Sequence, residues 1–120
     1  MRLLITLFTI GLLSACANTE QQNFATENNW YQVGTIDGQQ GHLEKSSNDL
    51  KKLASSGEIN LADYKKGYQE GLDSYCELSN AYILGVTRQY YQGVCEDRPN
   101  GWKFRENWIS GRHSTAAGVR

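Results

Sequence analysis

The sequence predicts a mainly α-helical fold: a small bundle of three to four short helices rich in glycine and aromatic residues, with an irregular disulfide-closed loop. Glycine and aromatic residues recur at steps of three and four, which places them on single helical faces. Two cysteines, Cys76 and Cys95, flank the stretch that lacks this period. A length of 120 residues favours one domain.

Overall composition narrows the function. Hydrophobic residues make up 39% of the chain and charged residues 21%, which is not the profile of a disordered protein. The formal net charge is −1, whereas nucleic-acid-binding proteins are usually strongly basic. We therefore expect no nucleic-acid partner.

Residues 1–15 have the features of a signal peptide. Arg2 supplies a positive charge, and the apolar stretch from Leu3 to Leu13 is shorter than the about 20 residues that a membrane-spanning helix needs. The stretch ends in Leu13-Ser14-Ala15-Cys16, which matches the bacterial lipobox, where the cysteine is lipidated and becomes the mature N-terminus. The alternative is an ordinary secretory signal followed by an incidental cysteine.

A lipidated Cys16 predicts a location in the bacterial cell envelope. Several acyl chains (palmitate among them) hold a protein stably on a membrane, since each buried methylene contributes about 0.8 kcal/mol. Ala17 stands where an aspartate commonly retains such proteins at the inner membrane, so we expect the outer membrane and its periplasmic face. After the lipidated cysteine, residues 16–29 are polar, and we expect them to form a flexible tether.

The two remaining cysteines, Cys76 and Cys95, are expected to form a disulfide because the space outside the cytoplasm is oxidising. Such a bridge contributes roughly 3 kcal/mol in the chain-entropy model. A redox or metal-binding pair is the alternative. The lack of CxxC spacing and of a nearby histidine disfavours it.

The first helix of the domain is expected over residues 30–41, with Asn28 or Asn29 as its cap. Three glycines share one face of this helix, beside apolar and acidic neighbours: Gly34, Gly38 and Gly41, next to Trp30, Val33 and Asp37. Each glycine costs about 1 kcal/mol relative to alanine, so three in register predict a close helix crossing. A phosphate-binding loop is the alternative, but its Lys-Ser/Thr ending and preceding strand are missing.

Two further helices are expected over residues 42–56 and 61–76. Leucines at heptad-like spacing mark the former, and Gly57 follows it as a stop. Asn60 is a suitable cap for the latter, three residues before Asp63. One face of this second helix carries an apolar stripe, and Gly67 and Gly71 form another: the apolar members are Tyr64, Tyr68, Leu72, Tyr75 and Cys76.

The C-terminal third is expected to be less regular. Turn residues such as Gly85 and Gly93 indicate that residues 78–100 form irregular structure or a short hairpin. A last helix is expected over residues 101–111, with Phe104 and Trp108 facing inward, and residues 113–120 form a polar tail. The globular domain then covers residues 30–112.

An aromatic residue stands three positions before a glycine repeatedly: Tyr31-x2-Gly34, Tyr64-x2-Gly67, Tyr68-x2-Gly71, Tyr82-x2-Gly85, Tyr90-x2-Gly93 and Trp108-x2-Gly111. These positions are neighbours on a helix, so we expect packing of rings against bare backbone. The alternative is an aromatic platform for sugars or peptidoglycan. The candidate residues for packing or interaction are Trp30, Gly34, Asp37, Gly38, Tyr64, Gly67, Gly71, Tyr75, Tyr82 and Trp108.

The spaced set resembles the DUF2799 family of small bacterial envelope lipoproteins, over roughly residues 30–112. The segments that carry the resemblance are Trp30-Tyr31-x2-Gly34-x2-Asp37-Gly38-x2-Gly41, Asp63-Tyr64-x2-Gly67-x3-Gly71-Leu72-x2-Tyr75-Cys76, Asn80-x-Tyr82-x2-Gly85, Tyr90-x2-Gly93-Val94-Cys95 and Phe104-x3-Trp108-x2-Gly111-Arg112. This chain departs from the family at Ala81 and Glu96, and it lacks a further glycine within residues 86–89. The resemblance implies an envelope location and domain limits, but no activity.

No pattern of catalytic residues stands out, and we expect neither an enzyme nor a cofactor. His42 with Asp37 and Glu44 is the best metal candidate, but zinc sites need three or four well-placed ligands, so we expect no metal. Asp73 and Glu77 share a helical face and would serve acid–base chemistry only if burial separated their pKa values. A solvated face is the simpler interpretation.

Three functions are ranked. The first is a non-catalytic structural or protein-interaction accessory of the outer membrane, held there by its lipid and partnered by an envelope protein. The second is a peptidoglycan- or glycan-binding module, with exposed aromatic rings near acidic residues, for example Trp30, Asp37 and Trp102. The third is a hydrolase, which requires convergent acids or a nucleophile in a deep pocket.

Overall fold

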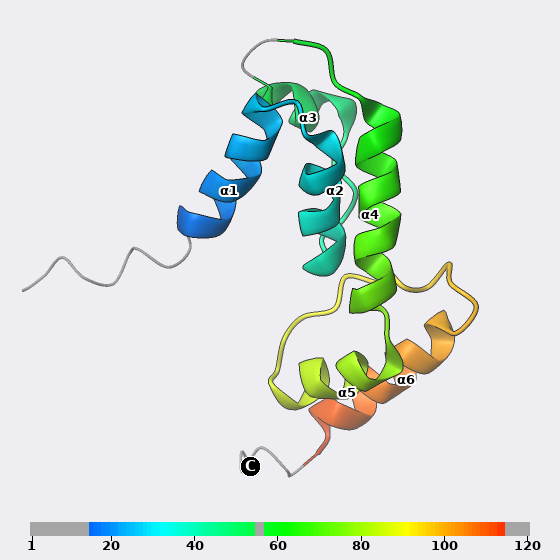
Figure 1. Cartoon of the computed structure of the whole chain (residues 1–120). Helices are drawn as coiled ribbons and strands as arrows, with labels where there is room; N and C mark the ends of the chain where they lie inside the picture. Colours follow the sequence, from blue (N-terminus) through cyan, green and yellow to red (C-terminus); the bar gives the residue numbers. More distant parts are fainter. Residues whose placement is uncertain (1–14, 55–56, 115–120) are drawn as a thin grey trace, which may run out of the picture.

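Six helices and no strand make up the described part of the chain (Figure 1). The computed structural model describes residues 15–54 and 57–114, so the expected signal peptide up to residue 14 and the tail from residue 115 lie outside the described residues. The helices are α1 (Ala15–Thr26), α2 (Trp30–Gln39), α3 (Ser47–Leu53), α4 (Leu61–Tyr75), α5 (Leu78–Val86) and α6 (Gly101–Arg112). The mainly helical prediction is confirmed, but the predicted count of three to four helices was too low. None of the described helices is long and apolar enough to cross a bilayer.

The central unit is the parallel pair α2 and α4, which cross at four glycines. A Cβ on Gly34 would lie 2.8 Å from the amide nitrogen of Tyr68, and one on Gly38 would lie 2.8 Å from that of Leu72. The partners advance together along both helices, which is the register of a parallel pair. From the other side, Gly67 and Gly71 face the backbone of α2 in the same way. Bare backbone therefore meets bare backbone, and the glycine stripes form the expected close crossing.

Local caps fix where these two helices begin. The side chain of Asn29 accepts a hydrogen bond from the amide of Gln32 at 3.3 Å. Asn60 accepts one from the amide of Asp63 at 3.0 Å. Both caps satisfy amide groups that the first helical turn leaves without intrahelical partners.

Residues 15–26, expected as part of a flexible tether, form helix α1 instead. Ala25 is 2% exposed and shares a core with Trp30 and Val33 of α2. The amide group of Gln22 donates to the carbonyl of Leu53 at 2.6 Å, which ties α1 to the end of α3. The polar appearance of the segment hides a narrow buried stripe, and this stripe docks the helix onto the domain.

The expected helix over residues 42–56 is shorter in the structure. Residues 42–46 are not helical, and α3 begins after Ser46, whose side chain accepts from the amide of Asp49 at 3.2 Å. Leu50 is fully buried and anchors α3 in the same core as Trp30. The chain leaves α2 through Gly41, whose φ of +68° a side chain would disfavour and whose Cα lies against the ring of Tyr75.

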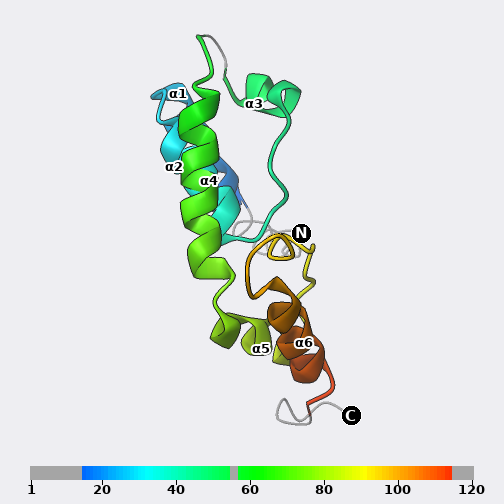
Figure 2. The same ribbon diagram turned by 90° about the vertical axis from the view of Figure 1, so that its right-hand side faces the viewer.

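A second parallel pair, α5 and α6, forms the other end of the molecule (Figure 2). Residues 78–86 are helical rather than irregular or a hairpin, which corrects the sequence prediction. Gly85 and Gly111 meet at the crossing, and a Cβ on either would lie 3.0 Å or less from the Cα of the other. Arg88, just beyond α5, donates to the carbonyl of Arg112 at the end of α6, so the two C-terminal ends lie together.

The two pairs define two lobes with separate cores. The N-terminal lobe consists of α1 to α4, and the C-terminal lobe of α5, the connection 87–100 and α6. Tyr75, at the end of α4, belongs to the core of the C-terminal lobe and stacks on Phe104 at 5.7 Å between centroids. The predicted disulfide Cys76–Cys95 is confirmed, with 5.6 Å between its Cα atoms, and it ties α4 to the connection 87–100.

Candidate functional site

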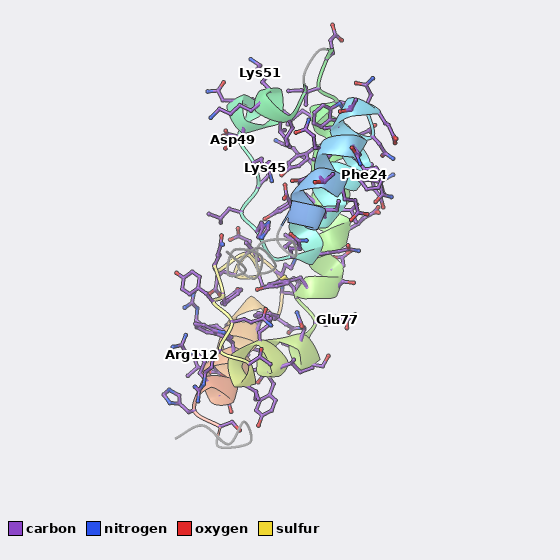
Figure 3. All side chains as sticks on the ribbon, turned by 90° about the vertical axis from the view of Figure 1, so that its left-hand side faces the viewer. Phe24, Lys45, Asp49, Lys51, Glu77 and Arg112 are labelled. Carbon is purple, nitrogen blue, oxygen red and sulfur yellow. A yellow bond between two sulfur atoms is a disulfide. The ribbon has the colours of Figure 1, made fainter. Side chains whose placement is uncertain are left out.

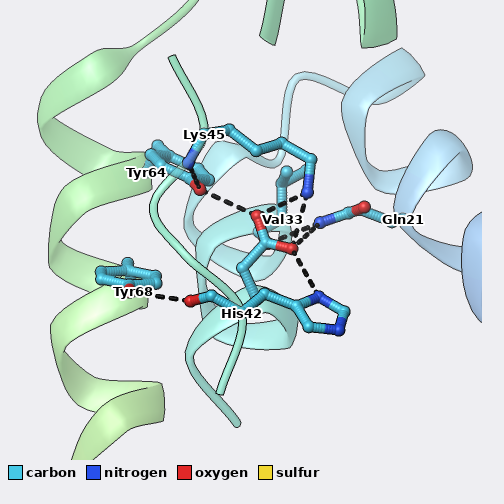
Figure 4. A network of polar contacts seen from close by, with 7 residues as sticks. Gln21, Val33, His42, Lys45, Tyr64 and Tyr68 are labelled. Atoms are coloured by element: carbon cyan, nitrogen blue, oxygen red, sulfur yellow. Dashed lines mark hydrogen bonds and ion pairs between the residues drawn. The ribbon is translucent and has the colours of Figure 1, made fainter. Parts of the chain in front are cut away.

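The most concentrated polar site in the described residues is centred on Asp37, on the face of α2 that points toward α1 and the connection 40–46 (Figure 4). Its side chain is 1% exposed, and it is the one buried acidic side chain in the described part of the chain. A buried carboxylate is costly unless it is paired and hydrogen-bonded. The surrounding contacts therefore decide whether Asp37 is structural or reactive.

Both carboxylate oxygens of Asp37 are occupied. Oδ1 accepts from the side-chain amide of Gln21 at 2.9 Å and from Nζ of Lys45 at 2.7 Å. Oδ2 accepts from Lys45 at 2.8 Å and from the hydroxyl of Tyr64 at 2.8 Å. Nδ1 of His42 lies 3.6 Å from Oδ1. Three separate elements thus supply donors to one carboxylate: α1, the connection after α2, and α4.

The partners of Asp37 are themselves held in place. Gln21 also donates to the carbonyl of Val33 at 3.1 Å. The hydroxyl of Tyr64 accepts from the amide of Lys45 at 2.9 Å while it donates to Asp37. We call Gln21, Asp37, His42, Lys45 and Tyr64 the Asp37 network. It fastens α1 and the connection 40–46 to the α2–α4 pair.

Burial shapes the electrostatics of the network. Desolvation raises the pKa of Tyr64 well above its ordinary value of 10.0, and the hydrogen bond to Asp37 raises it further. The phenol therefore stays protonated and remains a donor to the carboxylate. Lys45, with a side chain that is 25% exposed, supplies the compensating positive charge. A carboxylate with this many fixed donors is a structural crosslink rather than a general base, which needs an oxygen within reach of substrate.

The metal-ligand candidates do not assemble. His42 lies near Asp37, but the residues the structure describes contain no group of three or more His, Cys, Asp or Glu side chains placed to hold a metal ion. Glu44 is exposed and makes no contact with this carboxylate. Asp73, the other acid–base candidate, is 69% exposed and pairs with Arg98. Glu77, its expected partner, is exposed as well, so the pair lies on a solvated face.

The suggested sugar platform of Trp30, Asp37 and Trp102 is wrong as a single surface. Trp30 and Asp37 are each 1% exposed in the N-terminal lobe, whereas Trp102 is exposed on α6. Tyr64, Tyr75 and Trp108 are likewise buried, and the glycines of both crossings are covered by helix backbone. Tyr82 is the member of the candidate set that stays exposed, at 42%, with its hydroxyl donating to Ser114 at 3.0 Å.

Grooves in the described surface are shallow and of mixed chemistry. One of about 330 Å³ separates the two lobes and is lined by Leu43, Glu44, Tyr68, Gln69, Leu72, Gly93, Val94, Asp97 and Arg98. Another of about 540 Å³ lies between α3 and the start of α4. Arg98 spans the lobes by donating to Asp73 and to the carbonyl of Gln69, the latter at 2.9 Å.

Two members of the Asp37 network escaped the sequence interpretation. Gln21 lies in the segment expected to be a tether, and Lys45 was assigned to the polar face of a surface helix. A buried acid in a glycine-lined helix needs a cation nearby, which is the one signal that points to Lys45. No sequence signal points to Gln21.

Comparisons with known proteins give one match. No curated protein and no solved structure matches this chain. The family model described as "Protein of unknown function (DUF2799)" matches residues 29–113. That range begins at the cap of α2 and ends one residue after α6, so it takes in both helix pairs and leaves α1 outside. The chain belongs to the DUF2799 family.

Proposed function

We propose that this protein is a lipid-anchored, non-catalytic accessory of the bacterial outer membrane, attached through Cys16 and facing the periplasm. The signal-like residues 1–15 and the lipobox at Leu13-Ser14-Ala15-Cys16 support the anchor. The domain's role is to present a rigid helical surface to an envelope protein. Its buried carboxylate supports this role, since Asp37 is fully engaged in holding the fold together.

The observation that carries the interaction role is the distribution of exposed apolar side chains. Four large ones lie on the two helices of the C-terminal lobe: Tyr82, Ile83, Trp102 and Ile109, with exposures of 41–58%. Trp102 and Ile109 are seven residues apart and share a face of α6. Aromatic and large aliphatic side chains are the usual centres of protein interfaces.

Attachment is tested by metabolic labelling of cells with an alkyne-bearing palmitate analogue. Cys16→Ser is expected to abolish the label and to release the protein from the membrane fraction, because no other residue supplies the lipobox thiol. Ser14→Thr, a change beside the same cysteine, serves as the matched control and keeps the label. Label on the Cys16→Ser variant would overturn the proposed anchor.

Partner binding is tested by photocrosslinking in living cells. A photoreactive residue is placed at Ile83 or at Trp102, and a matched one at the exposed Lys65 on α4. We expect a reproducible envelope protein captured from the two C-terminal positions and not from the third. Capture of glycan fragments alone would favour the glycan-binding alternative. Equal capture from all three positions, or none from any, would contradict a partner surface on α5 and α6.

A further inference from the structure

Helix α1 leaves no slack between the proposed anchor and the domain. Cys16 lies in its first turn, and Gln21, five residues later, already bonds to Asp37 and Val33. At 1.5 Å of rise per residue, these positions are about 7.5 Å apart along the helix. A lipid on Cys16 would therefore hold the domain at the bilayer surface rather than at the end of a flexible arm.

The direction of α1 shows which part of the domain lies nearest to the anchor. Gln21 contacts Val33 and Asp37, whereas Ala25, one turn later, shares a core with Trp30. Moving toward the start of α1 thus means moving toward the end of α2, so the two helices are antiparallel. Figures 1 and 3 show this arrangement, with the first turn of α1 below Phe24 and pointing toward the C-terminal lobe. Cys16 consequently lies at the level of the turn that follows α2.

The two most exposed large apolar side chains occur beside that turn. Leu43, which follows α2, is 63% exposed, and Tyr90, in the connection 87–100, is 77% exposed. The segments that carry them are adjacent, because Leu43 lines the groove between the lobes together with Gly93 and Val94. By contrast, Leu61 stands at the start of α4, at the other end of the parallel α2–α4 pair.

We propose that α1 docks the domain against the bilayer so that Leu43 and Tyr90 enter the lipid headgroup region. This inference rests on the proposed anchoring through Cys16. Tyrosine is favoured at membrane–water interfaces, where its ring meets the acyl boundary and its hydroxyl stays in water. A leucine at the same depth adds burial of apolar surface. The occupant of this rim is phospholipid, which leaves α5 and α6 free for a protein partner.

The proposal is tested with the full lipidated chain in vesicles of phosphatidylethanolamine and phosphatidylglycerol. A single cysteine carrying an environment-sensitive fluorophore replaces Leu43 or Tyr90, with Leu61 and Ile83 as matched control positions. A headgroup spin-labelled phospholipid serves as the quencher. We expect a blue shift and strong quenching at positions 43 and 90, and neither effect at 61 and 83.

Two outcomes separate this inference from the anchor itself. Failure of every variant to co-sediment with vesicles would overturn the anchor and the inference together. Co-sedimentation with equal quenching at all four positions, or with none at 43 and 90, would overturn the docking alone. Both results are readable from the same samples.

The role of α1 is tested by one further pair of variants. Gln21→Glu places a second carboxylate against Asp37 and should release α1 from α2, whereas Asn23→Glu adds the same charge at an exposed position of the same helix. In the Gln21→Glu protein we expect the quenching at positions 43 and 90 to be lost while membrane binding persists. Unchanged quenching would show that α1 does not orient the domain. Circular dichroism of both variants verifies that the remaining helices stay folded.

Discussion

Gly71→Ala is expected to destabilise the domain, although alanine is the better helix former. A Cβ at this position would lie 2.5 Å from the carbonyl oxygen of Thr35, 2.8 Å from the amide nitrogen of Gln39 and 3.0 Å from the Cα of Gly38. All three atoms belong to the backbone of α2, so no side-chain rotation relieves the crowding. Ordinary contact begins near 3.5 Å, and α2 must therefore retreat by about 1 Å.

The size of the effect follows from two opposing terms. Overpacking of a tight contact costs about 1–3 kcal/mol, and the upper end applies because a gap of about 1 Å forfeits up to half of the dispersion energy along the crossing. Replacing a helical glycine by alanine returns about 1 kcal/mol. We expect a net loss of about 2 kcal/mol, which lowers the Tm by roughly 8–16 °C for a domain of this size.

The assay is urea and thermal unfolding followed by circular dichroism. Lys66→Ala, at an exposed position of the same helix, provides the control and should change stability by less than about 0.5 kcal/mol. A Gly71→Ala protein as stable as the wild type, or more stable, would refute the reasoning. That result would mean that propensity outweighs crowding and that α2 and α4 are farther apart than the structure shows.

Three further predictions concern the bridge, the buried carboxylate and the buried phenol. Joint replacement of Cys76 and Cys95 by serine should cost roughly 3 kcal/mol and lower the Tm, and an unchanged melting curve would contradict a structural bridge. Asp37→Asn should cost about 2–3 kcal/mol in urea unfolding, less than for a fully buried ion pair because its lysine partner is one-quarter exposed. Asp49→Asn, at an exposed pair, is the control and should cost less than about 1 kcal/mol. Burial raises the folded-state pKa of Tyr64, so its stabilising contribution is complete below about pH 10, the ordinary tyrosine pKa, and is lost as the pH rises further. Phenolate absorbance and circular dichroism should therefore change together in an alkaline titration, and phenolate formation complete before any unfolding would exclude a buried phenol.

The sequence interpretation succeeded where pattern and local chemistry agree. The helices that became α2, α4 and α6 each combine a regular apolar or glycine period with a polar residue at the start, and Asn29 and Asn60 supply true caps. It failed for α5, because the segment Leu78–Val86 is apolar on nearly every face and contains Gly85, a residue typical of turns. There the glycine is required by the approach of Gly111 rather than by a turn.

The Asp37 network could not have been predicted as a whole, because its members depend on tertiary contacts. Asp37 itself was visible beside the glycine stripe of α2. Gln21 becomes significant only once α1 is docked, and α1 shows few apolar residues because its buried stripe is little wider than Gln21 and Ala25. Polar composition alone therefore separates a tether poorly from a helix that docks through a hydrogen bond.

The repeated aromatic-x2-glycine spacing gains a single physical explanation from the two helix pairs. In the α2–α4 crossing, Gly34 lies against the carbonyl of Tyr64, and Gly67 against that of Tyr31. In the α5–α6 crossing, Gly85 lies against the carbonyl of Trp108, and Gly111 against that of Tyr82.

Each glycine thus contacts the carbonyl of the aromatic residue that stands three positions before its partner glycine. This arrangement brings the Cα of a glycine close to a carbonyl oxygen, a weakly favourable contact that recurs where helices cross closely. Large rings three residues away then cover the edges of the crossing or fill the adjoining core. The spacing is therefore the mark of one packing device used twice, and it explains why residues far apart in the chain share a motif without forming a common binding site.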